Sequence, residues 1–238
     1  MIANKILIRN IVDAALAEDL GSGDITTDNL FSKNETGCAI IIFKEKGIVA
    51  GLPLAEMVFK TLDPDLKWEQ FCQDGSKVFP NETIARLTGK MQAILSGERV
   101  ALNFLQRLSA IATKTALFVE KTAGHNVKIL DTRKTTPGLR VLEKYAVRMG
   151  GGYNHRFGLY DTAMIKDNHI KAAGTIAAAV LLLRKKLPVT AKIEVETETL
   201  AQVEEALAAG ADIIMLDNVP PDSWLWLWLH RQQRPSHG

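Results

Sequence analysis

The chain has 238 residues, of which 47% are hydrophobic and 24% are charged, and its formal net charge is +2. This composition is ordinary for a globular protein, and the length allows one large domain or two smaller ones. The charge is too near neutral to indicate nucleic-acid binding. The two cysteines, Cys38 and Cys72, indicate no disulfide framework and fit a reducing cytosol. Because no apolar run reaches the roughly eighteen residues of a membrane span, we expect a cytoplasmic protein with no membrane or nucleic-acid partner.

The first half of the chain combines helices with short β-like runs. Residues 1–20 place apolar side chains at helical spacing among acidic ones, which predicts an amphipathic helix and not a signal peptide. Residues 21–28 (GSGDITTD) predict a turn-rich break, and residues 38–87 predict short strands separated by loops. Residues 96–122 predict a long, mostly apolar helix.

The second half shows a different pattern, in which expected strands alternate with expected helices. Four apolar runs predict strands, at 127–132, 162–167, 191–196 and 211–217. Helical stretches are expected at 172–186 and 200–209. Strands that alternate with helices through short connections are typical of parallel βα units, so we expect a barrel or a doubly wound sheet.

Charge is distributed unevenly in this second half. Residues 128–171 contain nine Lys or Arg and four Asp or Glu, whereas residues 193–217 contain seven acidic residues and no basic one. A cationic part facing an acidic part suits a polyanionic substrate carried with a divalent metal. Two solvated helix faces of opposite charge would give the same counts. The strand context favours a site, because Glu194, Glu196 and Glu198 alternate and would place three carboxylates on one strand face.

Several nucleotide-binding patterns are absent from the sequence. There is no GxxxxGK[ST] phosphate loop and no GxGxxG after an expected strand. The acidic pair leading into a Thr- and Gly-rich phosphate loop, which marks type I phosphoribosyltransferases, is also missing. These absences argue against a P-loop nucleotide-binding protein, a dinucleotide-binding enzyme and a type I phosphoribosyltransferase.

Residues 131–170 (DTRKTTPGLRVLEKYAVRMGGGYNHRFGLYDTAMIKDNHI) closely resemble the signature region of quinolinate phosphoribosyltransferases. The resemblance covers residues 1 to about 218, and it includes EDLGSGDITT, GERVALNFLQRLSAIATKT, KIEVET and ADIIMLDN in the same order. It implies an α/β protein with an N-terminal α/β sandwich domain (residues 1–110) and an open α/β barrel domain (residues 111–238). It also implies assembly into a homodimer or a higher homo-oligomer.

The end of the chain departs from this family. Residues 219–238 contain the run WLWLWL and lack the additional strands and the glycine- and serine-rich phosphate loops that family members carry beyond the match to Asp217. This tail is either an unusual terminal element, with WLWLWL as an extra strand, or a sequence that has lost its original reading frame, and the second interpretation is favoured. We therefore expect a barrel that is incomplete at its C-terminus.

The resemblance implies a cationic pocket for quinolinate. In family members the pocket is lined by the residues matching Arg133, Lys134, His155, Arg156 and Lys166. Arg99 resembles an arginine that reaches the pocket from the neighbouring subunit. The chemistry agrees, because quinolinate carries two adjacent carboxylates and arginine forks bind carboxylates bidentately. Arg133 and Lys134 also follow an expected strand, at the end where barrel enzymes place their sites.

The acidic side of the expected site is formed by Glu196 and Asp217, which end successive strands. They resemble the family's acidic pair near the ribose, so we expect them to bind Mg²⁺ and, together with Lys134 and Lys166, to be catalytic. Carboxylates stabilise the positive charge that develops on a ribose as diphosphate leaves, and Mg²⁺ neutralises that diphosphate. The implied reaction joins quinolinate and 5-phosphoribosyl 1-diphosphate, with decarboxylation, to give nicotinate mononucleotide for NAD biosynthesis.

Each cation also has a structural interpretation. Arg99 alone would more often solvate its helix, and His155 alone would more often be a hydrogen-bonded loop residue. The glycines at 150–152 favour a site at His155, because they permit close backbone approach to a ligand. Lys166 in an apolar strand needs a partner, and Asp167 is a poor one because adjacent strand residues point to opposite faces. Three further cations are interpreted as a solvated or phosphate-steering helix face, namely Arg140, Lys144 and Arg148.

Three alternatives remain open at this point. A protein like those of the related ModD family, which is associated with molybdate transport operons, would use another anionic heterocycle as acceptor. A non-catalytic, truncated homologue would keep the subunit interface and little else. A Schiff-base lyase using Lys166 or Lys192 would leave the arginine cluster unexplained.

Overall fold

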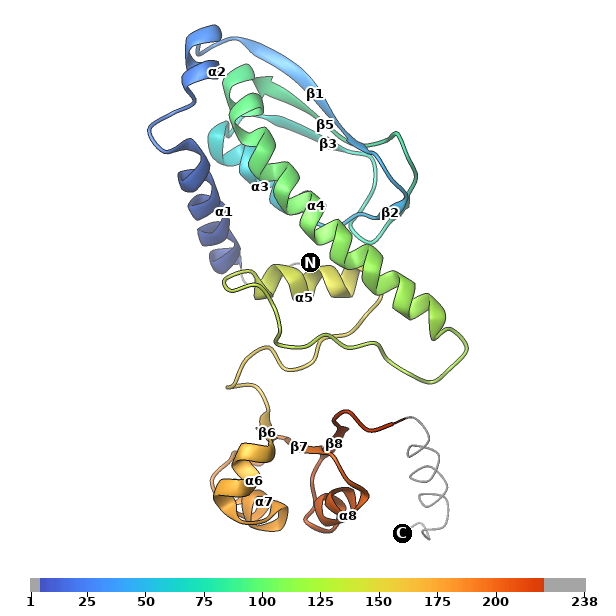
Figure 1. The fold of residues 1–238 in the computed structure, drawn as a ribbon. Helices are drawn as coiled ribbons and strands as arrows, with labels where there is room; N and C mark the ends of the chain where they lie inside the picture. Colours follow the sequence, from blue (N-terminus) through green and yellow to red (C-terminus); the bar gives the residue numbers. More distant parts are fainter. Residues whose placement is uncertain (1–4, 221–238) are drawn as a thin grey trace. The chain divides into compact units, whose positions relative to one another are not determined.

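The computed structural model describes residues 5–220, which fold into two compact units that divide between His155 and Arg156. Both units combine helices with sheets, so the chain has the expected α/β fold (Figure 1). The run WLWLWL, for which a strand was one of two interpretations, and the first four residues lie outside the described residues. Within residues 5–220, no helix is both long enough and apolar enough to cross a membrane.

The first unit mixes helices with short antiparallel strands. From residue 5 onward its elements are α1 (Lys5–Leu20), α2 (Ile25–Leu30), β1 (Thr36–Phe43), β2 (Gly47–Ile48), α3 (Leu52–Leu62), β3 (Lys67–Gln70), β4 (Lys77–Val78), β5 (Glu82–Lys90), α4 (Met91–Lys121), α5 (Arg140–Met149) and the isolated bridge between Leu130 and Tyr153. An antiparallel sheet has the order β1-β5-β3, and β2 pairs with β4. The predicted amphipathic helix and the predicted long helix are confirmed as α1 and α4.

The core of this unit is built around α4, which contacts the sheet and the helices α1, α3 and α5 (Figure 1). Its buried side chains recur at helical spacing, as at Ala101, Leu105, Leu108 and Ala112. The hydroxyl of Ser109 both accepts a hydrogen bond from the amide of Ala50 and donates one to its carbonyl. The helix is therefore fixed to the chain just before α3 by polar as well as apolar contacts.

Three local predictions for this unit are wrong. The break predicted at 21–28 holds only as far as Asp24, whose carboxylate caps α2 by accepting from the amides of Thr26 and Thr27. Residues 52–62, expected among strands and loops, form the helix α3. The strand predicted at 127–132 is reduced to the bridge between Leu130 and Tyr153, because no neighbouring strand among the described residues extends the pairing.

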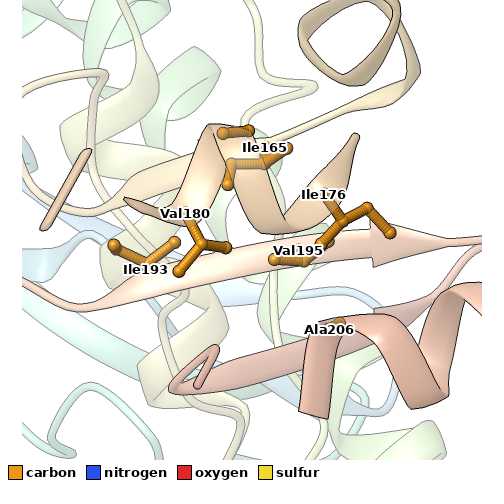
Figure 2. Close-up of a cluster of buried hydrophobic side chains, with 7 residues drawn as sticks. Ile165, Ile176, Val180, Ile193, Val195 and Ala206 are labelled. Carbon is orange, nitrogen blue, oxygen red and sulfur yellow. The ribbon is translucent and has the colours of Figure 1, made fainter. Parts of the chain in front are cut away.

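The second unit confirms the predicted parallel βα pattern. Its elements are β6 (Ala163–Ile165), α6 (Asp167–Ala173), α7 (Ile176–Arg184), β7 (Ile193–Thr197), α8 (Leu200–Ala208) and β8 (Ile213–Leu216). The sheet order is β6-β7-β8, and both pairings are parallel. Figure 2 shows its core, in which Ile165, Ile193 and Val195 of the strands lie among Ile176 and Val180 of α7 and a residue of α8. A capping box at Thr199 and Gln202 starts α8.

The two compact units divide the chain at a different place from the domain boundary predicted at residue 110. The helix α4 continues through that position without interruption, and α5 packs against α4 in the first unit. A compact unit of the structure need not end where a domain of the protein family ends. The boundary at 110 therefore stays a prediction.

Candidate functional site

Three of the predicted catalytic residues lie at the carboxyl edge of the parallel sheet. Lys166 directly follows β6, Glu196 is the next residue in register on β7, and Asp217 directly follows β8. The Nζ of Lys166 donates to Oε1 of Glu196 at 2.6 Å. Lys166 is also the N-cap of α6, where its amide donates to the imidazole Nδ1 of His169. The carboxyl edge of parallel strands is where α/β proteins bind ligands.

The pairing of Lys166 explains why a lysine follows an apolar strand. Its partner is Glu196 across the sheet, while Asp167 pairs with Lys171 one turn further along α6. The Lys166 side chain is 44% exposed and the Glu196 side chain is 17% exposed, so the pair lies at the surface of the edge. A partly exposed polar pair in this position can contact a ligand directly, with no rearrangement of the protein.

The prediction of three carboxylates on one strand face is wrong. Glu196 lies on β7, but Glu198 lies beyond its end, where its amide donates to the side chain of Gln202. Glu194 is on the strand and is 1% exposed. The alternation that favoured a carboxylate-lined face therefore stops with the strand at Thr197.

Arg156 is a buried cation whose described partners are uncharged. Its Nη1 donates to the carbonyl of Thr162 at 2.9 Å, and its Nη2 lies 3.2 Å from Sδ of Met164. The residue is 7% exposed, and its Nε is buried without a hydrogen-bond partner among residues 5–220. A buried guanidinium normally has a carboxylate partner, because the isolated charge is costly to desolvate. This arrangement suits an anionic ligand.

Arg133 and Lys134 lie in the irregular segment between the Leu130 bridge and α5. The Nε of Arg133 is also buried without a hydrogen-bond partner in the described part of the chain, and neither residue forms an ion pair with another described residue. The amide of Lys134 donates to Oγ1 of Thr132, which turns the segment locally. Two adjacent cations without a counter-ion among the described residues again favour binding of an anion.

The helix α5 holds this segment, and here the interpretation of its cations as a solvated face is wrong for Lys144. The Lys144 side chain is 3% exposed and pairs with Asp131, whose side chain is 7% exposed. The same ammonium donates to the carbonyl of His155 at 3.1 Å. Lys144 is therefore buried in a network of charge-assisted hydrogen bonds. Arg148 is exposed and stacks over the ring of Tyr153.

A second buried charge of α5 contacts the other end of the segment. The carboxylate of Glu143 accepts hydrogen bonds from Arg107 of α4 and from the amide of Thr136. Burial alone would raise the pKa of Glu143, but the hydrogen bonds from Arg107 and Thr136 outweigh it and hold the pKa below its usual range. Glu143 is therefore ionised at neutral pH.

The glycines at 150–152 have a structural role that the sequence did not indicate. A Cβ at Gly150 would lie 2.3 Å from the carbonyl oxygen of Ala112, and one at Gly152 would lie 2.8 Å from Cγ2 of Thr115. Gly151 has a φ of +85°. The first and third glycines thus allow close packing against α4, and ligand access is not needed to explain them.

His155 and Arg99 belong to the first unit and occupy different settings there. The amide of His155 donates to Asp131 at 2.9 Å, so its backbone is fixed by the same network as Lys144. Arg99 is exposed on α4 and borders an apolar hollow of about 900 Å³ between α4 and β1. The structure brings Lys166, Glu196 and Asp217 to one edge, and it places Arg133, Lys134 and His155 on segments joined through Asp131.

The carboxylates proposed to bind a metal ion are Glu196 and Asp217, at the edge of the parallel sheet. No group of three or more His, Cys, Asp or Glu residues with metal-binding geometry occurs within residues 5–220. Mg²⁺ does not require one, because it is commonly held by one or two carboxylates together with substrate phosphates and water. Asp217 is exposed and, within the described part of the chain, its carboxylate has no hydrogen-bond or salt-bridge partner. The donor set fits a magnesium ion that arrives with a phosphorylated substrate.

Comparison with known proteins identifies relatives over most of the chain. The model of the quinolinate phosphoribosyl transferase N-terminal domain matches residues 24–109, and that of the C-terminal domain matches residues 111–226. A probable nicotinate-nucleotide pyrophosphorylase [carboxylating] of Bacillus subtilis is 49% identical over 221 residues, which is 92% of this chain and 76% of that protein. A probable nicotinate-nucleotide pyrophosphorylase of Synechocystis is also 49% identical, over 87% of this chain and 70% of its own length.

Solved structures agree with the sequence relatives. The crystal structure of NadC from Streptococcus pyogenes has a TM-score of 0.89 and 43% identity, and the match covers 93% of this chain and 78% of that one. The nicotinate-nucleotide pyrophosphorylase from Francisella tularensis has the same TM-score at 40% identity, covering 95% of this chain and 80% of its own. Both the sequence and the fold of this chain are therefore similar to the same group of enzymes.

Proposed function

The chain belongs to the quinolinate phosphoribosyltransferase family, and we propose that it converts quinolinate and 5-phosphoribosyl 1-diphosphate into nicotinate mononucleotide, diphosphate and carbon dioxide. The observation that carries this proposal is that two buried arginines lack hydrogen-bond partners for their Nε atoms among the described residues, while other cations are paired. Arg133 and Arg156 each bury an Nε that no described residue satisfies, whereas Lys144 and Arg107 are paired with carboxylates. A dianionic substrate would supply the missing partners.

Quinolinate binding is assigned to the cations that have no counter-ion within residues 5–220. The two carboxylates of quinolinate are adjacent on the pyridine ring, so they require cations at two positions. Arg133 and Arg156 offer guanidinium forks, and Lys134 offers a mobile point charge. Fixed cations orient the ring so that its nitrogen faces the anomeric carbon of the ribose, which converts the encounter into an oriented reaction.

Transfer of the phosphoribosyl group is assigned to the edge of the parallel sheet. As the bond between the anomeric carbon and diphosphate breaks, positive charge develops on the ribose, and the carboxylates of Glu196 and Asp217 would stabilise it. Lys166 holds Glu196 in place through the 2.6 Å contact and presents a cation to the reacting anions. Mg²⁺, when bound with Asp217, Glu196 and the diphosphate, would neutralise the leaving group.

Decarboxylation follows from the charge of the product ring. Once the ring nitrogen has bonded to the anomeric carbon it is cationic, and the carboxylate on the adjacent carbon leaves as carbon dioxide. The electron pair of the broken bond stays on that carbon beside the positive nitrogen and is then protonated. The protein contributes position and electrostatics to this step, and Lys134 and Lys166 are the proposed catalytic cations.

The proposed reaction is tested by measuring nicotinate mononucleotide formed from quinolinate and 5-phosphoribosyl 1-diphosphate with Mg²⁺. Lys166→Met should reduce kcat by about 100-fold or more, since removing one preorganised electrostatic group typically has an effect of that size. Lys171→Met is the matched control, because Lys171 lies on the same helix with a side chain that is 74% exposed. Formation of no product by the parent chain, or an unchanged rate in Lys166→Met, would contradict the assignment.

Arg99 is proposed to complete the site of a second subunit in a homodimer. It is an exposed cation on α4 beside an apolar hollow, where a neighbouring chain can approach. Mixing Arg99→Ala chains with Lys134→Ala chains should restore about half of the quinolinate-binding sites in the hybrids, because one of the two sites then has both residues intact. Calorimetry on isolated hybrids measures this, and a complete lack of recovery would place Arg99 in the site of its own chain. The dimer and a cytoplasmic location otherwise stay predictions.

A further inference from the structure

The segment of residues 131–136 has no regular secondary structure, yet it carries Arg133 and Lys134. Its backbone is therefore not held by a strand or a helix of its own. Cations on a flexible segment would bind a small dianion weakly, because ordering the segment would oppose binding. Two sets of hydrogen bonds, one toward each end of the segment, anchor it.

The first anchor lies at Asp131. Its carboxylate accepts hydrogen bonds from Nζ of Lys144, Nδ2 of Asn154 and the amide of His155. Lys144 also donates to the carbonyl of His155, and Asn154 donates to the carbonyl of Lys144. Asp131 and Lys144 are almost fully buried, so the contact is shielded from water. This network joins the segment to α5 and to the backbone that carries His155.

The second anchor lies at Thr135 and Thr136. The amide of Thr136 donates to one oxygen of Glu143 at 3.3 Å, while Arg107 of α4 donates to the other oxygen and to the Thr136 hydroxyl. Nε of Arg140 donates to the hydroxyl of Thr135 at 3.0 Å. Side chains from the first five positions of α5 therefore contact both ends of the segment, and Arg133 and Lys134 lie between the two anchors.

We propose that α5 is the support that presets the quinolinate-binding cations, with Lys144 and Glu143 as positioning residues that act through Arg133 and Lys134. This inference rests on the proposed function for its substrate. Adjacent residues of a helix point in directions about 100° apart, so a neighbouring pair of opposite charges can reach two separate points of one segment. The buried ion pair with Asp131 thus positions the segment, and the stability of the fold depends on other contacts as well.

The anchoring is tested without any ligand by amide hydrogen exchange of a peptide covering residues 131–136. In Lys144→Met and in Glu143→Gln, exchange in this peptide should be at least about tenfold faster than in the parent. Glu143→Gln is informative because an amide has one acceptor oxygen where the carboxylate accepts on both oxygens. Tyr145→Phe is the control, since the hydroxyl of this residue of the same helix donates to Asp74, which accepts from the amide of Gly51 at the start of α3, and it has no hydrogen bond to the segment within the described residues. Unchanged exchange in both test variants would overturn the proposal.

The link to the substrate is tested by calorimetry with quinolinate in a double-mutant cycle. Lys144→Met should weaken binding about tenfold in the parent and clearly less in an Arg133→Ala background, because both changes remove the same interaction. A merely structural role would give independent effects that multiply, and Tyr145→Phe should lower the melting temperature without changing the affinity. If Lys144→Met does not fold, Glu143→Gln decides the same cycle. If the parent itself does not bind quinolinate, the proposed function fails, while the exchange experiment still decides the anchoring.

Discussion

Replacing Arg133 with alanine is expected to weaken quinolinate binding by at least about tenfold, which corresponds to about 1.4 kcal/mol. The Nε of Arg133 is buried without a described partner, so the bound dianion would be its counter-ion. Truncating one member of a desolvated charge pair leaves the other unpaired and generally costs about 2–5 kcal/mol, so the tenfold figure is a lower bound. Titration of quinolinate into the folded variant measures the change directly.

The control for this measurement is Arg86→Ala. Arg86 lies on β5 of the same unit, pairs with Glu69 and stacks over Phe71, and its side chain is 51% exposed. Its removal changes the net charge by the same amount without touching a candidate site. An affinity of Arg133→Ala equal to that of the parent would remove Arg133 from the quinolinate site.

The sequence predicted the second unit better than the first. Apolar runs alternating with helices specify parallel βα units through local periodicity, and the residues that follow strands in such units share one edge of the sheet. Lys166, Glu196 and Asp217 could therefore be assigned to one edge from their positions in the sequence alone. The pairing of Lys166 with Glu196 follows from the parallel register, because the preceding residues Ile165 and Val195 lie opposite each other.

The helix α3 was missed because its sequence signals conflict. The apolar run GIVAGL favours a strand, and it leads directly into the helix at Leu52. Two helix-start signals were nevertheless present in the sequence: Pro53 lies in the first turn, and Gly51 precedes the helix at the N-cap position. A β-like composition over six residues outweighed these signals, although apolar residues at helical spacing follow them.

The support of the candidate site could be predicted only in part. Lys144 follows buried Val141 by three residues, a spacing that places it on the inward face of α5 and could have marked it as a buried charge. Its partner Asp131 lies 13 residues away in an irregular segment, and Glu143 pairs with Arg107 across 36 residues. Periodicity describes a single element, so it carries no information about which distant charge completes such a pair.

The glycine run illustrates the same limit, because one local pattern fits two roles. Gly150 has a φ of −79°, a value that any residue adopts, so backbone conformation does not require glycine there. Its requirement comes from α4: an added Cβ would lie 2.3 Å from the carbonyl oxygen of Ala112 and 2.7 Å from Cβ of Thr115. Backbone and Cβ atoms cannot rotate away, so α4 and the end of α5 would have to separate.

Gly150→Ala is therefore expected to lower the free energy of unfolding by about 3 kcal/mol, the upper part of the range for overpacking. Urea denaturation monitored by circular dichroism measures the change, provided that the slope with denaturant stays constant. Gly124→Ala is the comparison: Gly124 has a φ of +85° and open space around it, so alanine there adds only backbone strain of about 1 kcal/mol. Because Arg107 of α4 pairs with Glu143 of α5, separation of the two helices should also speed amide exchange in residues 131–136, whereas Gly124→Ala should leave that exchange unchanged. A Gly150→Ala variant as stable as the parent, with unaltered exchange, would show that the contact with α4 does not explain this glycine, and a role in ligand access would then be the better explanation.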